Sequence, residues 1–331
     1  MIIAYDNQQQ RIKADQAKKD SEPFYCPGCH GPVHLRKGLL KRHHFAHYAA
    51  ANCEVFSEGE TEEHLSAKEL LYEWLTDETI EIEAYLPDLQ QRPDLLVGKT
   101  AIEVQCSALS WSRFVQRTEK YLAYNYSPWW LLGKHLQPQL HHRWTVLQKA
   151  CCRFAEQPGF YLWIIDTQEQ RVGLIYEINW HYKWGVSFRR RYFRKGEPIG
   201  CCPSLNNYSR KSCRTYHQRW QPEAYRVWLL HKLMQQQKQI LSLQALLYPL
   251  GGHIGNLPHW CYQPSDYGFL LEHRLLVLRF LFHQNANRNF SHWLNQLRKM
   301  NWNWLFPMID QGQLLKRIYQ ECSDFQKIQP F

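Results

Sequence analysis

Arg92-Pro-Asp-Leu-Leu-Val-Gly-Lys-Thr-Ala-Ile-Glu-Val-Gln105 carries the pattern from which the centre of the fold can be predicted. It predicts two short strands and a tight turn, because Gly98-Lys99-Thr100 separates two apolar runs. Side chains of the second run alternate between two faces. One face carries Ala101, Glu103 and Gln105, and the other carries Ile102, Val104 and Cys106. Asp94 on the first strand can lie across from the Glu103 face, and two carboxylates beside an amide predict a Mg²⁺ site that handles phosphate.

Composition and charge favour a large chain with an anionic partner. The 331 residues are enough for two or three domains and a sizeable core. A formal net charge of +10, from 40 Lys+Arg against 30 Asp+Glu, makes nucleic acid the first candidate partner. Residues 1–8 lack a basic n-region and an apolar h-region, and no apolar run is long enough to span a bilayer, so we expect a cytoplasmic protein. The 11 scattered cysteines then indicate reduced thiols and a metal site, not disulfides.

A zinc site is predicted near the N-terminus. Cys26-Pro-Gly-Cys29 presents two thiolates from one turn, and histidines follow in Lys41-Arg-His-His-Phe-Ala-His47. The spacing is C-x2-C-x14-H-x2-H or C-x2-C-x13-H-x3-H, and both approximate structural zinc spacings. The expected ligands are Cys26, Cys29, His44 and His47, with His43 as the alternative histidine and Cys53 as a spare. Four protein ligands leave no open position, so this site is expected to stabilise a small module. The alternative is a pair of turn cysteines without metal.

Helix and strand patterns flank the two central strands. Residues 61–75 predict an amphipathic helix with Thr61 as its N-cap, and residues 80–86 alternate like a half-buried strand. Residues 111–126 predict a second helix, with Phe114, Tyr121 and Leu122 as candidates for its buried side, and residues 127–133 predict one more strand. The predicted order is helix, three strands, helix, strand.

This order, with Asp94 on the second strand and Glu-x-Gln on the third, resembles the core of the PD-(D/E)xK nuclease superfamily. The fuller set of motifs resembles the competence protein CoiA family. These motifs are Cys26-Pro-x-Cys, His44-Phe-Ala-His, Gly59-Glu-Thr-Glu-Glu-His-Leu-x-x-Lys, Arg92-Pro-Asp and Ile102-Glu-Val-Gln-Cys-Ser. The resemblance covers residues 1–135 by motif. It implies a cytosolic protein of natural transformation that processes or recombines incoming DNA, with recombination proteins as further partners.

The resemblance also implies roles for particular residues. Asp94 and Glu103 match the carboxylates that bind Mg²⁺ or Mn²⁺, and Gln105 stands where many members have lysine. An amide cannot supply the positive charge of lysine, so activity is weaker or another cation substitutes; Lys68, Arg117 and Lys120 are the candidates. Glu60 or Glu63 is expected to complete the metal shell, and His64 to contact phosphate or water. The alternative for these charges is an ordinary solvated helix or strand face.

The remaining chain carries a second basic segment and a helical end. Residues 160–166 and 171–178 predict a hairpin that either extends the sheet or begins another domain. Rings and cations interleave after it, and this surface suits single-stranded DNA, unless the rings belong to a core and the cations to its rim. The DNA-binding candidates are Arg189, Arg190, Arg191, Arg194, Lys195, Arg117 and Lys120. Residues 224–247 predict one long helix, whose surface carries Gln235-Gln236-Gln237.

The fold class expected from these observations is α/β: a PD-(D/E)xK-like mixed sheet flanked by helices, a small zinc module and a mainly helical C-terminal region. The expected domains are 1–56 (zinc module), 57–156 (nuclease-like), 157–221 (basic and aromatic extension) and 222–331 (helical). The expected function is metal-dependent hydrolysis of DNA phosphodiester bonds. Two alternatives remain open: a DNA-binding recombination accessory protein that has lost catalysis, and a zinc-stabilised adaptor for a protein partner.

Overall fold

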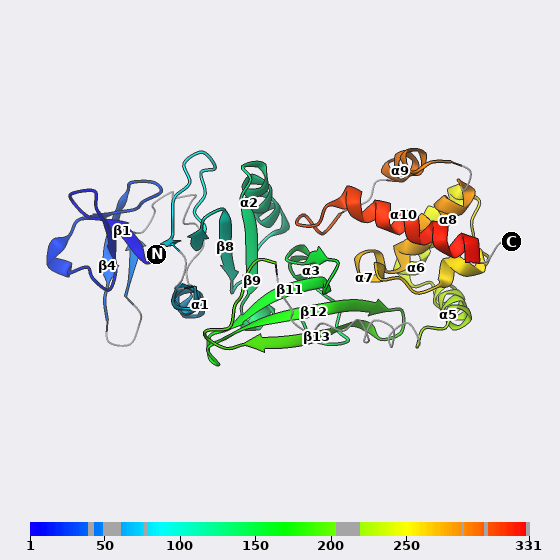
Figure 1. Cartoon of the computed structure of the whole chain (residues 1–331), viewed down its shortest axis with the longest axis horizontal. Coiled ribbons are helices and arrows are strands. Elements are labelled where there is room, and N and C mark those ends of the chain that lie inside the picture. The colour runs from blue at the N-terminus through cyan, green and yellow to red at the C-terminus, as the bar shows by residue number, and fades with distance from the viewer. Residues whose placement is uncertain are drawn as a thin grey trace.

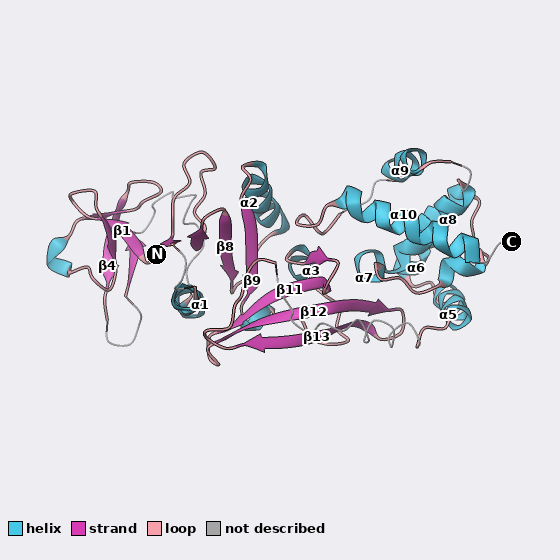
Figure 2. Ribbon diagram, viewed as in Figure 1, coloured by secondary structure: helices cyan, strands magenta, loops and turns pink. Residues whose placement is uncertain are grey.

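The computed structural model describes residues 1–38, 43–48, 61–75, 79–202, 219–285, 288–300 and 304–328. The chain forms an elongated molecule in which a small N-terminal sheet, a large central sheet and a C-terminal group of helices follow one another along the long axis (Figure 1). The expected fold class is confirmed: a mixed sheet is flanked by helices, with a small Cys/His-bearing module before it and a helical region after it (Figure 2).

The N-terminal module is a five-stranded antiparallel sheet with its own small core. Its strand order is β2-β1-β3-β4-β5, and the strands are β1 (Ile3–Tyr5), β2 (Arg11–Lys13), β3 (Phe24–Tyr25), β4 (Pro32–Arg36) and β5 (His44–His47). Phe24, Val33, Leu35 and Phe45 pack together in its interior. A core of this size gives a small domain little stability by itself.

The central sheet runs in the order β13-β12-β11-β9-β8-β7-β6, with β10 paired to β11. Its strands are β6 (Ile80–Ile82), β7 (Leu95–Val97), β8 (Thr100–Gln105), β9 (Ser127–Leu132), β10 (Arg153–Ala155), β11 (Gly159–Asp166), β12 (Arg171–His181) and β13 (Gly185–Phe193). β8 and β11 run parallel to β9, while β6-β7-β8 and β11-β12-β13 are antiparallel meanders. The predicted hairpin at 160–178 therefore extends the sheet, the first of the two arrangements left open by its sequence.

Two helices cover opposite faces of this sheet. α1 (Glu62–Trp74) begins at Thr61, whose side chain caps the His64 amide as predicted, and it packs against the face that carries Ile102 and Val104. α2 (Trp111–Ala123) packs against the other face through Phe114 and Tyr121. Leu122, also expected on the buried side, is 42% exposed, so that prediction is wrong.

The C-terminal region is helical and shares one hydrophobic core with the α2 face of the sheet. Its helices are α5 (Pro222–Met234), α6 (Lys238–Leu247), α7 (Gly268–Leu271), α8 (Leu275–Gln284), α9 (Phe290–Arg298) and α10 (Gln311–Ile328); the short α3 (Val146–Ala150) lies between this region and the sheet. The prediction of one helix over 224–247 is wrong, because Gln236 has a left-handed φ of 53° and the glutamines form a turn between α5 and α6. Among the residues described, none of the helices has the length and apolar character needed to cross a bilayer.

Candidate active site and metal centre

The hairpin of β7 and β8 brings Asp94 opposite Glu103. Its ladder pairs Leu95 with Ile102, so the residue before β7 stands across from the residue after Ile102. The Val104 amide donates a hydrogen bond to Asp94 Oδ2 over 2.8 Å, which fixes the aspartate against β8. Gly98, with a φ of 55°, provides the left-handed residue that the connection between the strands requires. The hairpin predicted from residues 92–105 is thus formed, with both carboxylates at one end of it.

Asp94 is held as a charged carboxylate by groups from α1. Its Oδ2 lies 2.9 Å from His64 Nε2, and its Oδ1 lies 3.9 Å from Lys68 Nζ. Burial alone would raise the pKa of Asp94. The charges of His64 and Lys68, with the Val104 amide, outweigh burial and hold that pKa well below its ordinary value.

Glu103 is held by groups from α2. Arg117 donates to its Oε1 over 2.6 Å and the Tyr121 hydroxyl donates to the same atom over 2.5 Å. The pKa of Glu103 is raised to about 7, because burial and, to a smaller extent, the negative charge of Asp94 outweigh the lowering effects of Arg117 and Tyr121. A buried carboxyl destabilised by a neighbouring carboxylate is a common property of active sites, because the repulsion is relieved by a cation.

The two carboxylates therefore form a pair that could hold a divalent ion. Both are oxygen donors, as Mg²⁺ and Mn²⁺ prefer; Glu103 is buried, whereas the Asp94 side chain keeps 13% of its surface exposed. Asp94 depends on α1 and Glu103 on α2, so an ion bound between them would tie together the two layers that flank the sheet. No third carboxylate converges on them within the ranges that the structure describes.

The other expected residues of this site are distributed more widely. Glu63 lies near the end of β9, where its Oε1 accepts the Lys134 amide over 2.7 Å. Gly133 permits this approach, since a Cβ there would come within 2.8 Å of Glu63 Oε1 and of Cys106 Sγ. Glu60 lies outside the described residues.

Gln105 stands where the resemblance to PD-(D/E)xK nucleases implies a lysine in many members, and its side chain is buried. Gln105 donates from Nε2 to the Ser107 carbonyl over 2.9 Å. Of the three candidate substitute cations, Lys68 reaches Asp94 and Arg117 reaches Glu103. Lys120 instead donates to the Leu89 carbonyl over 3.1 Å, away from both carboxylates.

Sequence reasoning missed Glu83, a buried carboxylate beside this site. Its side chain is fully buried and lies 2.5 Å from Lys68 Nζ and 3.0 Å from an Arg92 nitrogen. In a regular strand over residues 80–86, Glu83 would share a face with Glu81, which is exposed. The strand ends at Ile82, however, and Glu83 has a left-handed φ of 52° that turns its side chain inward. Its amide donates to the Asp94 carbonyl over 3.0 Å.

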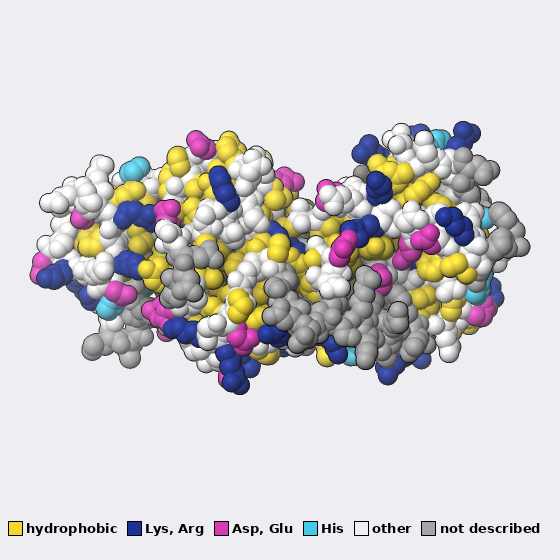
Figure 3. All heavy atoms as spheres, viewed as in Figure 1, with side chains coloured by type: hydrophobic (Ala, Val, Ile, Leu, Met, Phe, Trp, Pro, Cys, Tyr) yellow, Lys and Arg dark blue, Asp and Glu magenta, His cyan; other side chains and the backbone are white. Residues whose placement is uncertain are grey.

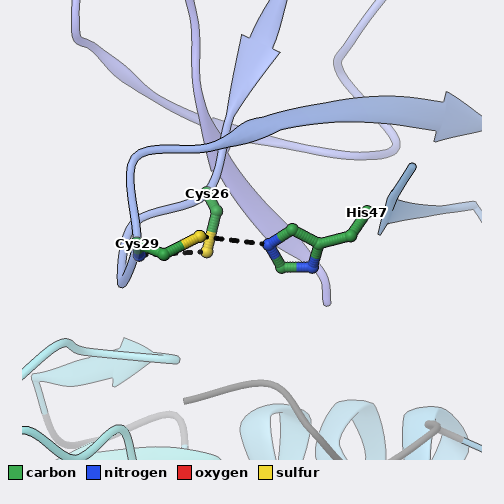
Figure 4. A group of neighbouring side chains, drawn as sticks. All are labelled: Cys26, Cys29 and His47. Atoms are coloured by element: carbon green, nitrogen blue, oxygen red, sulfur yellow. Dashed lines mark hydrogen bonds between the residues drawn. The ribbon is translucent and has the colours of Figure 1, made fainter. Parts of the chain in front are cut away.

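The second candidate centre lies in the N-terminal module. Cys26 Sγ, Cys29 Sγ and His47 Nε2 all lie within 4.8 Å of one another, and Cys29 Sγ is 3.3 Å from His47 Nε2 (Figure 4). The Gly28 amide donates to Cys26 Sγ over 3.3 Å, and the Gly31 amide donates to Cys29 Sγ over 3.4 Å. Two sulfurs and one imidazole nitrogen fit zinc in type and spacing.

The histidine pair expected from spacing is not formed. Residues 44–47 are a strand, so side chains three positions apart point to opposite faces. In the β4–β5 register His47 pairs with Val33, while His44 pairs with Arg36. His43 Nδ1 lies 3.1 Å from Asp15 Oδ1, and Cys53 lies outside the described residues. Within the described ranges, the cluster thus offers three candidate metal ligands.

Five of the seven predicted DNA-binding residues lie along the edge of the central sheet, while Arg117 and Lys120 lie on α2. β13 carries Arg189, Arg190 and Arg191, and Arg194 and Lys195 come directly after it. Several of these cations face carboxylates: Arg189 lies 3.6 Å from Glu177, Arg191 2.9 Å from Glu197 and Lys195 2.8 Å from Glu73. On the face drawn in Figure 3, Lys and Arg side chains are scattered among other types and do not gather into one patch.

The rings of this segment belong mostly to the core, the second of the two arrangements that the sequence left open. Trp180 and Phe193 are buried, and Phe188 and Tyr192 pack against the main cluster. Trp184 is exposed by 42% and stacks on His181. The sequence pattern of rings and cations thus reflects an amphipathic strand, with rings inward and guanidinium groups at the edge.

Comparisons with known proteins place both the N-terminal module and the central sheet in one protein family. Residues 6–56 match the family described as Competence protein CoiA, N-terminal domain, and residues 60–194 match Competence protein CoiA, nuclease-like domain. The chain is 34% identical over 198 residues to Competence protein CoiA of Bacillus subtilis (strain 168), covering 58% of this chain and 47% of that protein. The chain thus spans about half the length of this curated relative. No solved structure gives a significant match.

Proposed function

We propose that this chain, which belongs to the competence protein CoiA family, processes DNA in natural transformation by metal-dependent hydrolysis of phosphodiester bonds. The observation that carries the proposal is the facing pair of Asp94 and Glu103 in a nuclease-like domain. A divalent ion between them would supply Lewis-acid activation of the phosphate and of a water molecule. The family resemblance implies a cytosolic protein of natural transformation, and we therefore also propose that the protein acts in the cytoplasm.

The residues around the pair would have separate roles in binding the ion, the phosphate and water. Asp94 and Glu103 would hold the ion. His64, whose ring nitrogen lies 2.9 Å from Asp94, is placed to contact a phosphate oxygen or the attacking water. Lys68 and Arg117 would provide the positive charge that Gln105 lacks, because each lies beside one of the two carboxylates. Gln105 would position water through its amide.

The basic edge at β13 is our candidate for binding the DNA backbone. β9, β11 and β12 lie between β8 and β13. Four strand steps of about 4.8 Å place this edge roughly 19 Å from the carboxylate pair. A single strand of several nucleotides could reach from one to the other, and the salt dependence of binding should reflect the cations that it meets.

A cleavage assay tests the proposal. Wild type, Asp94→Ala and Glu103→Ala are incubated with single- and double-stranded DNA and Mg²⁺ or Mn²⁺, with Asp88→Ala as a control for an exposed aspartate near the same hairpin. We expect wild type and the control to cut, and each site variant to lose at least about 100-fold in rate, the usual loss when an electrostatic contact of the reaction is removed. Equal cleavage by Asp94→Ala and wild type would refute the assignment.

The second candidate is a DNA-binding accessory protein without catalysis. Gln105 favours it, because this buried amide is turned to the Ser107 carbonyl and carries no charge. In that case wild type and Asp94→Ala bind DNA equally and neither cuts. Absence of DNA binding at low salt would instead favour an adaptor for a protein partner.

We also propose that Cys26, Cys29 and His47 bind a structural zinc ion. Their donor types support this, as does the small core of the module they belong to. Metal analysis of Cys26→Ser tests the assignment. Zinc content equal to that of wild type would exclude Cys26 as a ligand.

A further inference from the structure

Glu83 joins the N-terminal module to the nuclease-like site. Its Oε2 accepts the backbone amides of Ile2 and Ile3 over 2.9 and 3.1 Å, across 81 and 80 residues of sequence. The same oxygen lies 3.0 Å from Arg92, and Oε1 lies 2.5 Å from Lys68 Nζ. The two backbone amides come from the N-terminal module, and the two cations come from the elements that carry the candidate active site.

The Glu83 backbone is held in a conformation that glutamate seldom adopts. Its φ of 52° lies in the left-handed region, which costs a residue with a Cβ about 1–2 kcal/mol. Such an arrangement persists where surrounding contacts determine it, and these arrangements cluster at functional sites. In this conformation the Glu83 carboxylate is buried and faces Lys68, whose Nζ in turn lies 3.9 Å from Asp94 Oδ1.

A continuous series of contacts leads back from Glu83 to the Cys/His cluster. Met1 pairs with Phe45 through two hydrogen bonds of 3.1 and 2.8 Å. Phe45 lies on β5 two residues before His47 and faces the module core. The first three residues of the chain therefore contact β5 on one side and Glu83 on the other.

We infer that Glu83 is a positioning residue that fixes Lys68 beside Asp94, and that the N-terminal module completes the nuclease-like site by donating the Ile2 and Ile3 amides to Glu83. The inference rests on the proposed function for its catalytic meaning, but the contacts themselves can be tested without cleavage. Loss of the module's amides leaves a buried carboxylate short of donors, and the ammonium of Lys68 is then no longer confined.

The test uses a substitution that removes a backbone donor. Ile2→Pro lacks the amide hydrogen, whereas Ile2→Ala keeps it and loses only the side chain. Cys29→Ser perturbs the other end of the contact series. The accessibility of Lys68 is read by amine labelling of the full chain and mass spectrometry. Lys195, whose side chain is 60% exposed, serves as the internal reference that labels in every variant.

We expect Lys68 to be protected in wild type and in Ile2→Ala. Its labelling rate should rise by about tenfold or more in Ile2→Pro and in Cys29→Ser, the ratio that corresponds to one lost hydrogen bond to a charged group. Hydrogen exchange of residues 238–247 in α6 monitors whether the rest of the chain stays folded. Where Ile2→Pro fails to fold, Glu83→Gln, which removes the charge that pairs with Lys68, gives the same comparison.

Cleavage kinetics then connect positioning to function. We expect kcat in Ile2→Pro to fall by about tenfold with KM for DNA unchanged, since the Glu83 side chain is 0% exposed and so out of reach of a substrate. Unchanged Lys68 labelling in both Ile2→Pro and Cys29→Ser would overturn the inference. Increased labelling in a protein whose wild type does not cut DNA would support the positioning contact and refute the proposed function.

Discussion

Replacing Lys68 by Met should destabilise the chain strongly, because it breaks an ion pair that is inaccessible to water. Both side chains of the pair, Lys68 and Glu83, are 0% exposed, and their charged atoms are 2.5 Å apart. Removing one partner of such a pair costs about 3–5 kcal/mol. Glu83 keeps Arg92 and the amides of Ile2 and Ile3 as donors. The lower end of the range, about 3 kcal/mol, is therefore expected.

Urea unfolding of Lys68→Met, Glu83→Gln and the double variant measures this contribution. If Lys68 and Glu83 interact as the structure shows, the loss in free energy of unfolding of the double variant is about 1–3 kcal/mol smaller than the sum of the losses in the two single variants. Lys195→Met is the matched control, because its ion pair with Glu73 has a similar separation, 2.8 Å, but both side chains are more than half exposed. This control should cost less than about 1 kcal/mol. Additivity of the Lys68 and Glu83 substitutions within about 0.5 kcal/mol would refute the pairing.

Three further outcomes can be measured directly. His47→Ala should abolish zinc binding while His44→Ala leaves one zinc per chain, because the strand turns the two rings to opposite faces. Metal analysis of both variants checks this, and loss of zinc from His44→Ala with retention in His47→Ala would show that the ligand assignment is wrong. Burial lowers the pKa of His273 to about 4 from 6.5. Because the unfolded chain binds this proton at a higher pH than the folded chain, the contribution of His273 to the free energy of unfolding is complete above pH 6.5 and falls by about 3 kcal/mol as pH is lowered toward 4. The urea midpoint of wild type should therefore decline over this range, and that of His273→Phe should decline less. Gln236→Gly should stabilise the chain by about 0.5–1 kcal/mol in thermal unfolding, since glycine adopts the left-handed φ of 53° without strain; a lower Tm would contradict this.

Local signals in the sequence were sufficient for most of the central elements. The hairpin of β7 and β8 depends on Gly98 and on alternation within six residues, and α1 begins at the hydroxyl of Thr61 as predicted. Each signal operates between residues that are neighbours in the chain. Predictions failed where a single backbone conformation interrupted a pattern. Gln236 divides one helical run into two helices, and Glu83 ends a strand four residues early.

The candidate site was predictable in its residue types more than in its contacts. Asp94 and Glu103 could be placed opposite each other because both lie on one hairpin. Which cation serves which carboxylate could not be predicted, since Lys68 and Arg117 lie on helices that cover opposite faces of the sheet. The direction of a long side chain depends on packing between such layers. It therefore cannot be predicted from the sequence pattern of either helix.

The hairpin, the helix that precedes it, the cysteine knuckle and the family can all be predicted from the amino-acid sequence, because each is set by residue types at short spacing. Contacts between distant segments were needed to establish that His47 and not His44 lies with the cysteines, and that Glu83 turns inward to meet Lys68, Arg92 and the first residues of the chain. The physical reason is distance along the chain: the Glu83 carboxylate is stabilised by donors as many as 81 residues away, and no local periodicity records a partner so remote.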